Sequence, residues 1–256
     1  MPDAPMSGAP MSGAPMSVPA PPSVPAPLPT GTPVSPHGPA WLRSPVGLGR
    51  ATAALLGLVV ATDLFAIRAD RTMYDVASAL VDGRTGEGIR RKADHADSLY
   101  SAAGYAQTGA LLATVVVFLV WFHRARINAE VFDPFGHGKS RAWTFWGWFV
   151  PVLNLWRPRR IMLDIWDASA PRGVRVSHGL VNVWWALWLI ALAADRASMT
   201  EHRHAGTPLE IQHAAGQTMF ADATDIAAAL LAILVVLRLT RMQNEKALRG
   251  PAAAAV

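Results

Sequence analysis

Basic, aromatic and amide side chains gather in one stretch of the chain, between residues 123 and 160. The set that we nominate for binding chemistry comprises His123, Arg124, Arg126, Asn128, Trp148, Asn154, Arg157, Arg159 and Arg160. Guanidinium groups bind phosphate through paired hydrogen bonds and stack on indole rings. The set is therefore a candidate contact for an anionic lipid or another phosphate. The alternative is that these residues are interfacial anchors, which fix the depth and orientation of the chain in a membrane.

Three carboxylates, Asp63, Asp222 and Asp225, lie within or at the edge of apolar stretches. An ionisable group inside a membrane is costly, and it indicates by default a functional site, here one for a proton or another cation. The alternative is structural. Asp222 and Asp225 would then occupy the favourable first turn of a helix, while Asp63 would pair with Arg68 or extend toward the interface.

Histidines and glutamates between residues 201 and 213 have the side chains of a divalent-metal site. Their spacing matches no compact site and Pro208 separates them, so we interpret this stretch as a solvated loop. The chain has no cysteine, which excludes thiolate chemistry. It also has no glycine-rich phosphate loop, nucleophile elbow or His-Glu-x-x-His sequence. We therefore expect no catalytic residue, no metal and no cofactor, and we do not expect an enzyme.

Four apolar stretches must position these residues: 51–67, 103–122, 180–194 and 219–239. About 20 apolar residues cross a hydrocarbon core ~30 Å thick, so each stretch, with its flanks, predicts a membrane-spanning helix. Only 16% of the residues are charged, whereas 52% are hydrophobic. We predict an all-α, polytopic membrane protein whose four-helix transmembrane bundle occupies residues 45–243.

The distribution of basic residues predicts the orientation of the four spans. The net charge is +5, and most cationic residues flank the apolar stretches, which favours an anionic membrane face over nucleic acid. With the N-terminus inside, 15 of the 23 Lys and Arg residues lie on the cytoplasmic side, in agreement with the positive-inside rule. We therefore predict a multi-pass protein of the cell membrane with both termini cytoplasmic.

The aromatic stretch 143–156 competes with this topology, because a fifth span there would reverse the ends. The five-span arrangement also places 15 basic residues inside, so charge does not separate the two. Fourteen residues that include Gly147, Pro151 and Asn154 are short for a crossing. We predict an interfacial or re-entrant segment over 143–169. Its second part is an amphipathic helix on the inner leaflet, with an apolar stripe formed by Ile161, Met162, Ile165 and Trp166.

Proline-rich repeats occupy the beginning of the chain. Ala4-Pro5-Met6-Ser7-Gly8 is repeated at once, and Val18-Pro19-Ala20-Pro21 recurs at residues 24–27. Prolines at this density prevent helix and sheet, and little apolar surface is present to offset the ordering entropy. We predict a disordered leader over residues 1–44, which serves as a docking site for a proline-binding protein or as a solvated spacer. A short tail, 244–256, ends the chain.

Two runs of sequence resemble a known family. Residues 121–129 read Trp-Phe-His-Arg-Ala-Arg-Ile-Asn-Ala, and residues 147–158 read Gly-Trp-Phe-Val-Pro-Val-Leu-Asn-Leu-Trp-Arg-Pro. Together they resemble actinobacterial membrane proteins that carry the domain of unknown function 4328, over approximately residues 45–245. The resemblance implies a multi-spanning protein, often with a disordered proline-rich N-terminus, and it carries no assigned activity.

Two classes of function follow from these features. The first is a non-enzymatic membrane interaction or organising protein, which works through its cytoplasmic leader and basic inner loop. The alternative is a transporter, channel or lipid-handling protein, which uses the inner basic set or the outer-leaflet carboxylates. The expected partners are the lipid bilayer, with anionic lipids among them, and a proline-binding protein for the leader. No nucleic acid is expected, and the sequence is compatible with a homo-oligomer.

Overall fold

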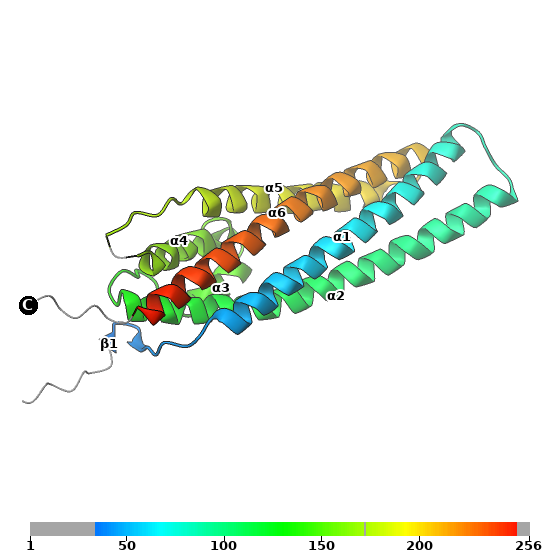
Figure 1. The fold of residues 1–256 in the computed structure, drawn as a ribbon. Coiled ribbons are helices and arrows are strands. Elements are labelled where there is room, and N and C mark those ends of the chain that lie inside the picture. Colours follow the sequence, from blue (N-terminus) through cyan, green and yellow to red (C-terminus); the bar gives the residue numbers. More distant parts are fainter. Residues whose placement is uncertain (1–33, 172, 250–256) are drawn as a thin grey trace, which may run out of the picture. The chain divides into compact units, whose positions relative to one another are not determined.

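The computed structural model describes residues 34–171 and 173–249 (Figure 1). The predicted disorder of the leader concerns mainly residues 1–33, which lie outside the described residues. The elements in chain order are β1 (Val34–Ser35), β2 (Gly38–Pro39), α1 (Val46–Val81), α2 (Glu87–Phe132), α3 (Trp143–Phe149), the 3-10 turn η1 (Leu153–Leu155), α4 (Arg157–Ser169), α5 (Gly179–His204) and α6 (Pro208–Leu248). The two short strands form an antiparallel pair in which Val34 lies opposite Pro39.

Four helices, α1, α2, α5 and α6, are long and apolar enough to cross a membrane. Within each, the most apolar window of 18 residues has a mean hydropathy between 1.3 and 2.1. The predicted fold class, an all-α protein with four membrane-spanning helices, is therefore confirmed. The helices are longer than a crossing needs. The 36 residues of α1 and the 46 of α2 correspond to about 54 and 69 Å at 1.5 Å per residue.

The extra length comes from polar stretches, in which the sequence predicts a short helix around Met73 to Val81 and loops elsewhere. Residues 68–81, 87–100, 195–204 and 208–218 continue the spanning helices. Only residues 82–86 and 205–207 connect them, where Gly83 and Gly86 have positive φ values of 75° and 116°. The start of α6 is fixed by a capping box, because the Thr207 hydroxyl accepts from the Glu210 amide and the Glu210 carboxylate accepts from the Thr207 amide.

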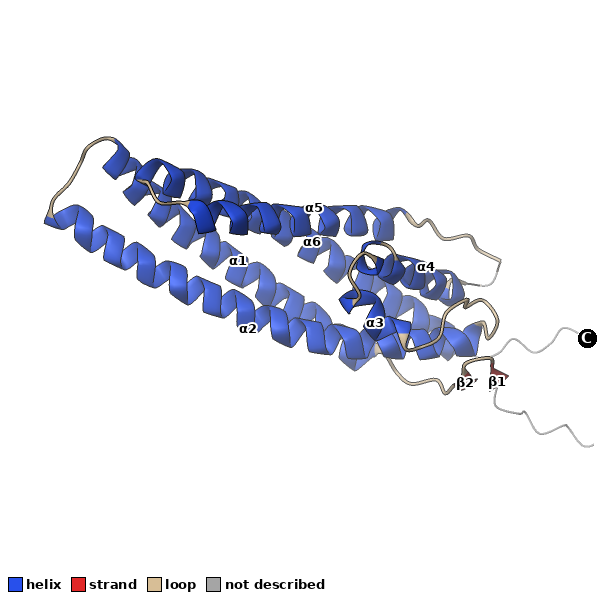
Figure 2. Ribbon diagram, turned by 180° about the vertical axis from the view of Figure 1, so that it is seen from behind, coloured by secondary structure: helices blue, strands red, loops and turns tan. Residues whose placement is uncertain are grey.

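The helices pack in a regular order. Helix α1 packs along both α2 and α6, and α5 packs along α6 (Figures 1 and 2). The short helices α3 and α4 lie against the ends of α2, α5 and α6. We call this end of the bundle, with the start of α1 and the ends of α2 and α6, the basic end. The opposite end, with residues 82–86 and 205–207, is the connector end.

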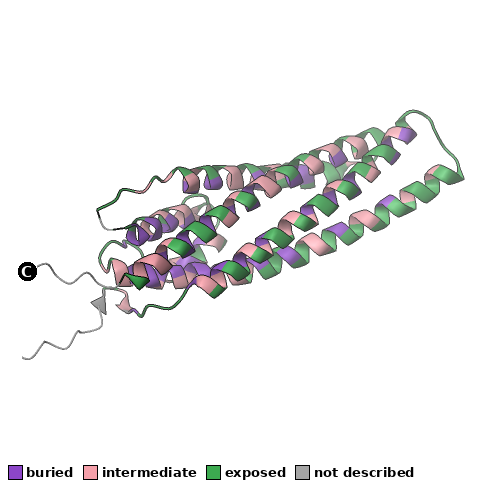
Figure 3. Ribbon diagram, viewed as in Figure 1, coloured by how far each residue is buried: buried purple, intermediate pink, exposed green. Residues whose placement is uncertain are grey.

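The apolar core lies largely at the basic end. Its largest fully buried apolar side chains belong to α2, α4, α5 and α6, and they are Trp121, Phe122, Ile161, Met162, Ile165, Trp166, Val181, Val235 and Leu239. The predicted apolar stripe of α4 is thus turned into the protein (Figure 3). This differs from the expected position on the leaflet surface. An apolar stripe is covered equally well by lipid or by neighbouring helices, and here the neighbouring helices cover it.

Candidate functional site

The nominated basic set divides into internal and accessible residues. Arg126 and Asn128 are buried, with 2% and 0% of their surface exposed. Arg126 pairs with Glu130 at 2.7 Å and donates to the Lys139 carbonyl at 2.7 Å. Arg141 shares the same Glu130 carboxylate at 2.6 Å. These partners engage Arg126 within the protein, and its contact with a lipid headgroup stays a prediction.

Asn128 joins four segments of the chain at the basic end. Its amide oxygen accepts from the Arg43 amide at 3.0 Å, and its Nδ2 donates to the Arg43 carbonyl and to Gln243. Gln243 in turn donates to the Ala125 carbonyl and the Ser169 hydroxyl. The segment before α1 is thereby tied to α2, α4 and α6. Asn128 thus joins structural segments, and its headgroup contact also stays a prediction.

Four more of the nominated residues hold helices together. His123 Nδ1 lies 2.9 Å from the Thr144 hydroxyl of α3, and Arg159 donates to Asn182 of α5 at 2.8 Å. Arg124 reaches the carbonyl of the residue before Pro45 at 3.5 Å. The Trp148 ring contacts aromatic rings of α2 and α5, namely Phe118, Phe122, Trp185 and Trp188. Asn154 is half-buried in η1.

The last two, Arg157 and Arg160, line a pocket of about 470 Å³ at the basic end. The pocket is formed by the loop after α2 and the start of α4, and its other lining residues include Gly138, Lys139, Trp156 and Asp164. Sequence reasoning omitted Lys139 because it lies in a glycine-rich loop, apart from the arginines. Only this part of the predicted basic set faces an open space.

The carboxylates form a second cluster, nearer the connector end. Gln107 of α2 donates from Nε2 to Asp63 of α1 at 3.1 Å and to Asp222 of α6 at 2.9 Å. Asp70, two turns further along α1, is buried near Asp222 of α6. Asp63, Asp70 and Asp222 are 3%, 1% and 6% exposed. We call these three aspartates and Gln107 the carboxyl cluster. Asp225 is half-buried beside it on α6.

The carboxyl cluster has no basic partner among the described residues. Among the described residues, no Lys, Arg or His forms an ion pair with any of its aspartates, so the expected partnership of Asp63 with Arg68 is wrong. One oxygen of each aspartate, Oδ2, is buried and accepts no hydrogen bond from an N–H or hydroxyl of the described residues. Buried polar atoms are almost always paired, so three such oxygens together are unusual.

The cluster belongs to a polar line on one face of α2. Tyr100, Gln107, Thr114, Trp121 and Asn128 follow one another at intervals of seven residues, which is the period of a helix seam against its neighbours. Thr114 is buried, and the Trp121 indole donates to the Thr240 hydroxyl of α6 at 3.0 Å. The line runs from the connector end to the basic end. The sequence carries this seven-residue signal, but a search for charged residues alone does not find it.

The depth of the cluster follows from the helix rise. Asp63 lies 13 residues beyond Arg50 on α1, and Asp222 lies 16 residues before Arg238 on α6. These separations correspond to about 20 and 24 Å along the helices. Measured from these arginines, Asp63 and Asp222 would lie in the far part of a hydrocarbon layer about 30 Å thick. Asp70 lies 20 residues beyond Arg50, about 30 Å along α1, and would lie at the edge of that layer.

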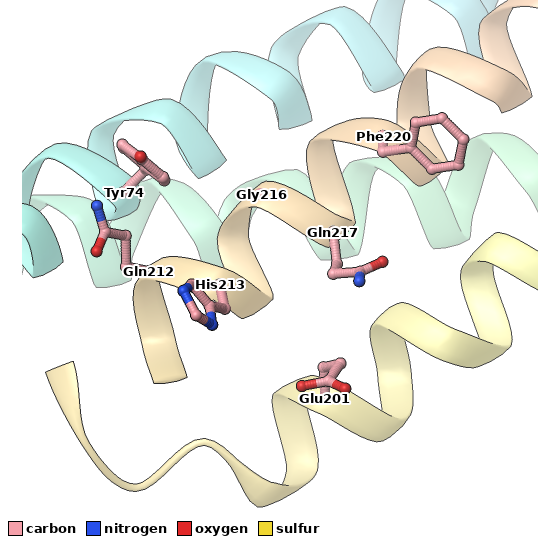
Figure 4. A pocket seen from close by; sticks show the side chains of 7 residues that line it. All are labelled: Tyr74, Glu201, Gln212, His213, Gly216, Gln217 and Phe220. Atoms are coloured by element: carbon pink, nitrogen blue, oxygen red, sulfur yellow. The ribbon is translucent and has the colours of Figure 1, made fainter. Parts of the chain in front are cut away.

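Two of the pockets at the connector end are lined by α5 and α6. The smaller, of about 200 Å³, is lined by Asp70 of the carboxyl cluster and by Asp97, Tyr100 and His202. The Tyr100 and His202 rings stack at 5.1 Å. The larger, of about 520 Å³, contains Tyr74, Glu201, His213 and Gln217 (Figure 4). These residues belong to helices rather than to the solvated loop that we expected, and the described residues contain no group of three or more ligands arranged to hold a metal ion.

Comparison with known proteins identifies the family to which the chain belongs. Neither a curated protein nor a solved structure matched the chain. The model of one family, described as Domain of unknown function (DUF4328), matches residues 84–241. The match covers more than half of the chain, from the start of α2 to most of α6, and it includes Gln107 and Asp222 of the carboxyl cluster. The protein therefore belongs to the DUF4328 family of proteins.

Proposed function

We propose that this protein moves protons across the membrane, with the carboxyl cluster as its proton-binding site. The observation that carries the proposal is the pair of hydrogen bonds from Gln107 to Asp63 and Asp222, within a cluster that has buried, unpaired oxygens. Carboxyl groups of this kind within membrane helices are typical of proton relays. A proton is the smallest cation, and it needs no coordination shell from the protein.

Asp70 and Asp222, buried near one another on the neighbouring helices α1 and α6, favour a proton in particular. Two ionised carboxylates have only acceptor oxygens, so they form a hydrogen bond only when one of them carries a proton. Like charges in contact also disfavour ionisation of both groups. Gln107 supplies donors to the other side of Asp222. A proton that enters or leaves this group changes the bonds that join α1, α2 and α6.

The two ends of the bundle offer a route to the cluster. Asp70 forms part of the 200 Å³ pocket at the connector end, together with Asp97 and His202. Toward the basic end, Thr114 and the Trp121–Thr240 pair continue the polar line of α2. Successive levels of this line lie about 10 Å apart, so water molecules between them complete the relay.

The experiment is a proton-flux measurement in vesicles. The purified protein is reconstituted with a trapped pH-sensitive dye, and a pH difference is imposed. The wild type should equilibrate the pH faster than empty vesicles. Asp222→Asn should fall to the rate of empty vesicles, because the neutral amide no longer exchanges a proton. Asp75→Asn, which changes an exposed aspartate of helix α1, is the control and should retain the wild-type rate. Wild-type protein no faster than empty vesicles would contradict the proposal.

A second candidate is the interaction or organising role. The segment before α1 is fixed to the basic end by Asn128, and the Arg141 guanidinium donates to the Gly38 carbonyl at 3.0 Å. A leader that continues from this segment would be presented to the cytoplasm in the predicted orientation. Deletion of residues 1–33 should then abolish recovery of a proline-binding partner and leave proton flux unchanged. Equal recovery of that partner by the shortened protein would exclude this role for the leader.

A further inference from the structure

The basic-end pocket contains three cations, none of which hydrogen-bonds to a carboxylate of the described residues. Arg157 lies 4.6 Å from the centre of the Trp143 ring, and its Nη1 is buried without a hydrogen-bond partner among the described residues. Arg160 is exposed, and its nearest carboxylate, Asp164, is 3.9 Å away, too far for a hydrogen bond. Lys139 forms no ion pair within the described residues. The three cations therefore favour the binding of an anion in this pocket.

Asp164, the carboxylate of the pocket, offsets little of the positive charge of the three cations. Burial raises the pKa of Asp164 from its ordinary value, although Arg160, Arg126 and Lys139 act in the opposite direction. Even with Asp164 ionised, three cations face one carboxylate. The pocket also lies at the start of the 13-residue helix α4, whose N-terminus carries no side-chain cap. A helix N-terminus attracts negative charge, so helix and side chains favour the same ligand.

Apolar surface adjoins the pocket. Trp156 lines the pocket and is 48% exposed, and the preceding turn exposes Val152 and Leu155. Trp146 and Phe149 of α3 are also exposed. Val152 has φ of 67°, an unfavourable conformation for a β-branched residue, and the strained turn places this apolar surface beside the cations. Tryptophan and aliphatic side chains beside basic groups are typical of the layer where lipid headgroups meet acyl chains.

We propose that the pocket formed by Lys139, Arg157 and Arg160 binds the phosphate of an anionic phospholipid, whose acyl chains lie against the exposed surface around Trp156. The Arg157 guanidinium, already oriented by Trp143, donates paired hydrogen bonds to the phosphate. Lys139 and Arg160 close over the headgroup from the loop and from α4. The pocket is distinct from the carboxyl cluster, so lipid binding stands or falls independently of proton movement.

The test uses the full-length protein in nanodiscs of phosphatidylcholine with a minor fraction of phosphatidylglycerol. Native mass spectrometry counts the bound phosphatidylglycerol. The variant Lys139→Gln, Arg157→Gln and Arg160→Gln should lose at least about tenfold in affinity, because each basic residue near an anionic surface contributes about 1 kcal/mol. A matched variant at the connector end, Arg90→Gln, Arg91→Gln and Lys92→Gln, loses the same charges from exposed positions and should keep the lipid.

Further measurements distinguish a specifically bound lipid from diffuse electrostatic attraction and from a bound soluble phosphate. Wild-type binding should persist at 0.5 M salt, where the Debye length is below about 8 Å, and Arg157→Lys should weaken it, because lysine lacks the paired geometry. Melting curves of both triple variants check folding. Equal lipid loss in the two triple variants, or none in the first, would overturn the proposal. Inorganic phosphate that displaces the lipid at equal concentration would assign the pocket to a soluble anion instead.

Discussion

Single residues determine the chemistry at both ends of the bundle. Only some of them could be identified from the sequence. Asp63 and Asp222 were predicted because charged groups inside apolar stretches are conspicuous. Asp70 was missed because it lies just beyond the apolar stretch, and Gln107 because an amide carries no charge. The partners of Arg126 and Asn128 could not be predicted, since sequence does not reveal that Glu130 and Gln243 contact them.

His137 should make stability depend on pH. Its ring is 5% exposed. Burial lowers the pKa of His137 from its ordinary value, Arg126 lowers it further, and the Ala129 carbonyl, Glu130 and Asp133 act in the opposite direction. The unfolded chain therefore binds this proton more readily than the folded protein. The stability is fully present above the unfolded pKa of about 6.5, and it is lost as the pH falls through the lowered folded value.

Melting temperatures in detergent at about pH 8 and about pH 5.5, on either side of the ordinary histidine pKa, check this prediction. His137→Gln should show a smaller loss on acidification than the wild type, because the ring that must charge is gone. His95→Gln, which changes an exposed histidine of α2, should lose as much as the wild type. If all three proteins lost stability equally, His137 would not be the group responsible.

At the scale of the elements, the sequence predicted the spanning helices but not their ends. The length of each apolar stretch was sufficient to predict a spanning helix there. Apart from a short helix around Met73 to Val81, the polar extensions were not predicted, because they lack an apolar stripe. The sequence Thr207-Pro208-Leu209-Glu210 nevertheless matches a capping box. The burial of α4 was beyond prediction, because the same stripe faces lipid or protein according to which helices surround it.

The polar line of α2 predicts that the Thr114 hydroxyl lies on the proton route. Thr114 and Thr108 both donate to the carbonyl four residues earlier, at 2.7 and 2.8 Å, but Thr114 is buried and Thr108 is exposed. Thr114→Val keeps the side-chain shape and removes the hydroxyl from the line, so it should slow proton flux in vesicles. Thr108→Val should leave the flux unchanged. The same flux in both variants would exclude Thr114 from the route.

The contact of α1 with α6 depends on a glycine. A Cβ atom at Gly49 would collide with Thr240, whereas Gly57 on the same helix faces open space. Gly49→Ala should destabilise the protein by about 1–3 kcal/mol through overpacking. Gly57→Ala should be neutral or stabilising by up to about 1 kcal/mol, because alanine favours a helix. Chemical denaturation of the two variants gives the comparison, and equal stabilities would contradict the close approach of α1 and α6.

At the scale of the whole molecule, the two ends of the bundle differ in charge, and this predicts the topology. Helix α3 has seven residues, about 10 Å, which is too short for a crossing. The chain has no cysteine, so single cysteines report cleanly. Cysteines at Ser140 and Arg175 should label from the cytoplasm, and a cysteine at Thr85 from outside. Labelling of residues 140 and 175 from opposite sides would establish a fifth span.

The central claim is that the carboxyl cluster holds an exchangeable proton. Infrared spectroscopy of the protein in membranes measures this directly, since a protonated carboxyl group has a band that an ionised one lacks. The wild type should show such a band at neutral pH, and the band should disappear on alkalinisation. It should be lost in Asp222→Asn and kept in Asp75→Asn. A wild-type spectrum without a protonated carboxyl band at neutral pH, or an unchanged band in Asp222→Asn, would contradict the account.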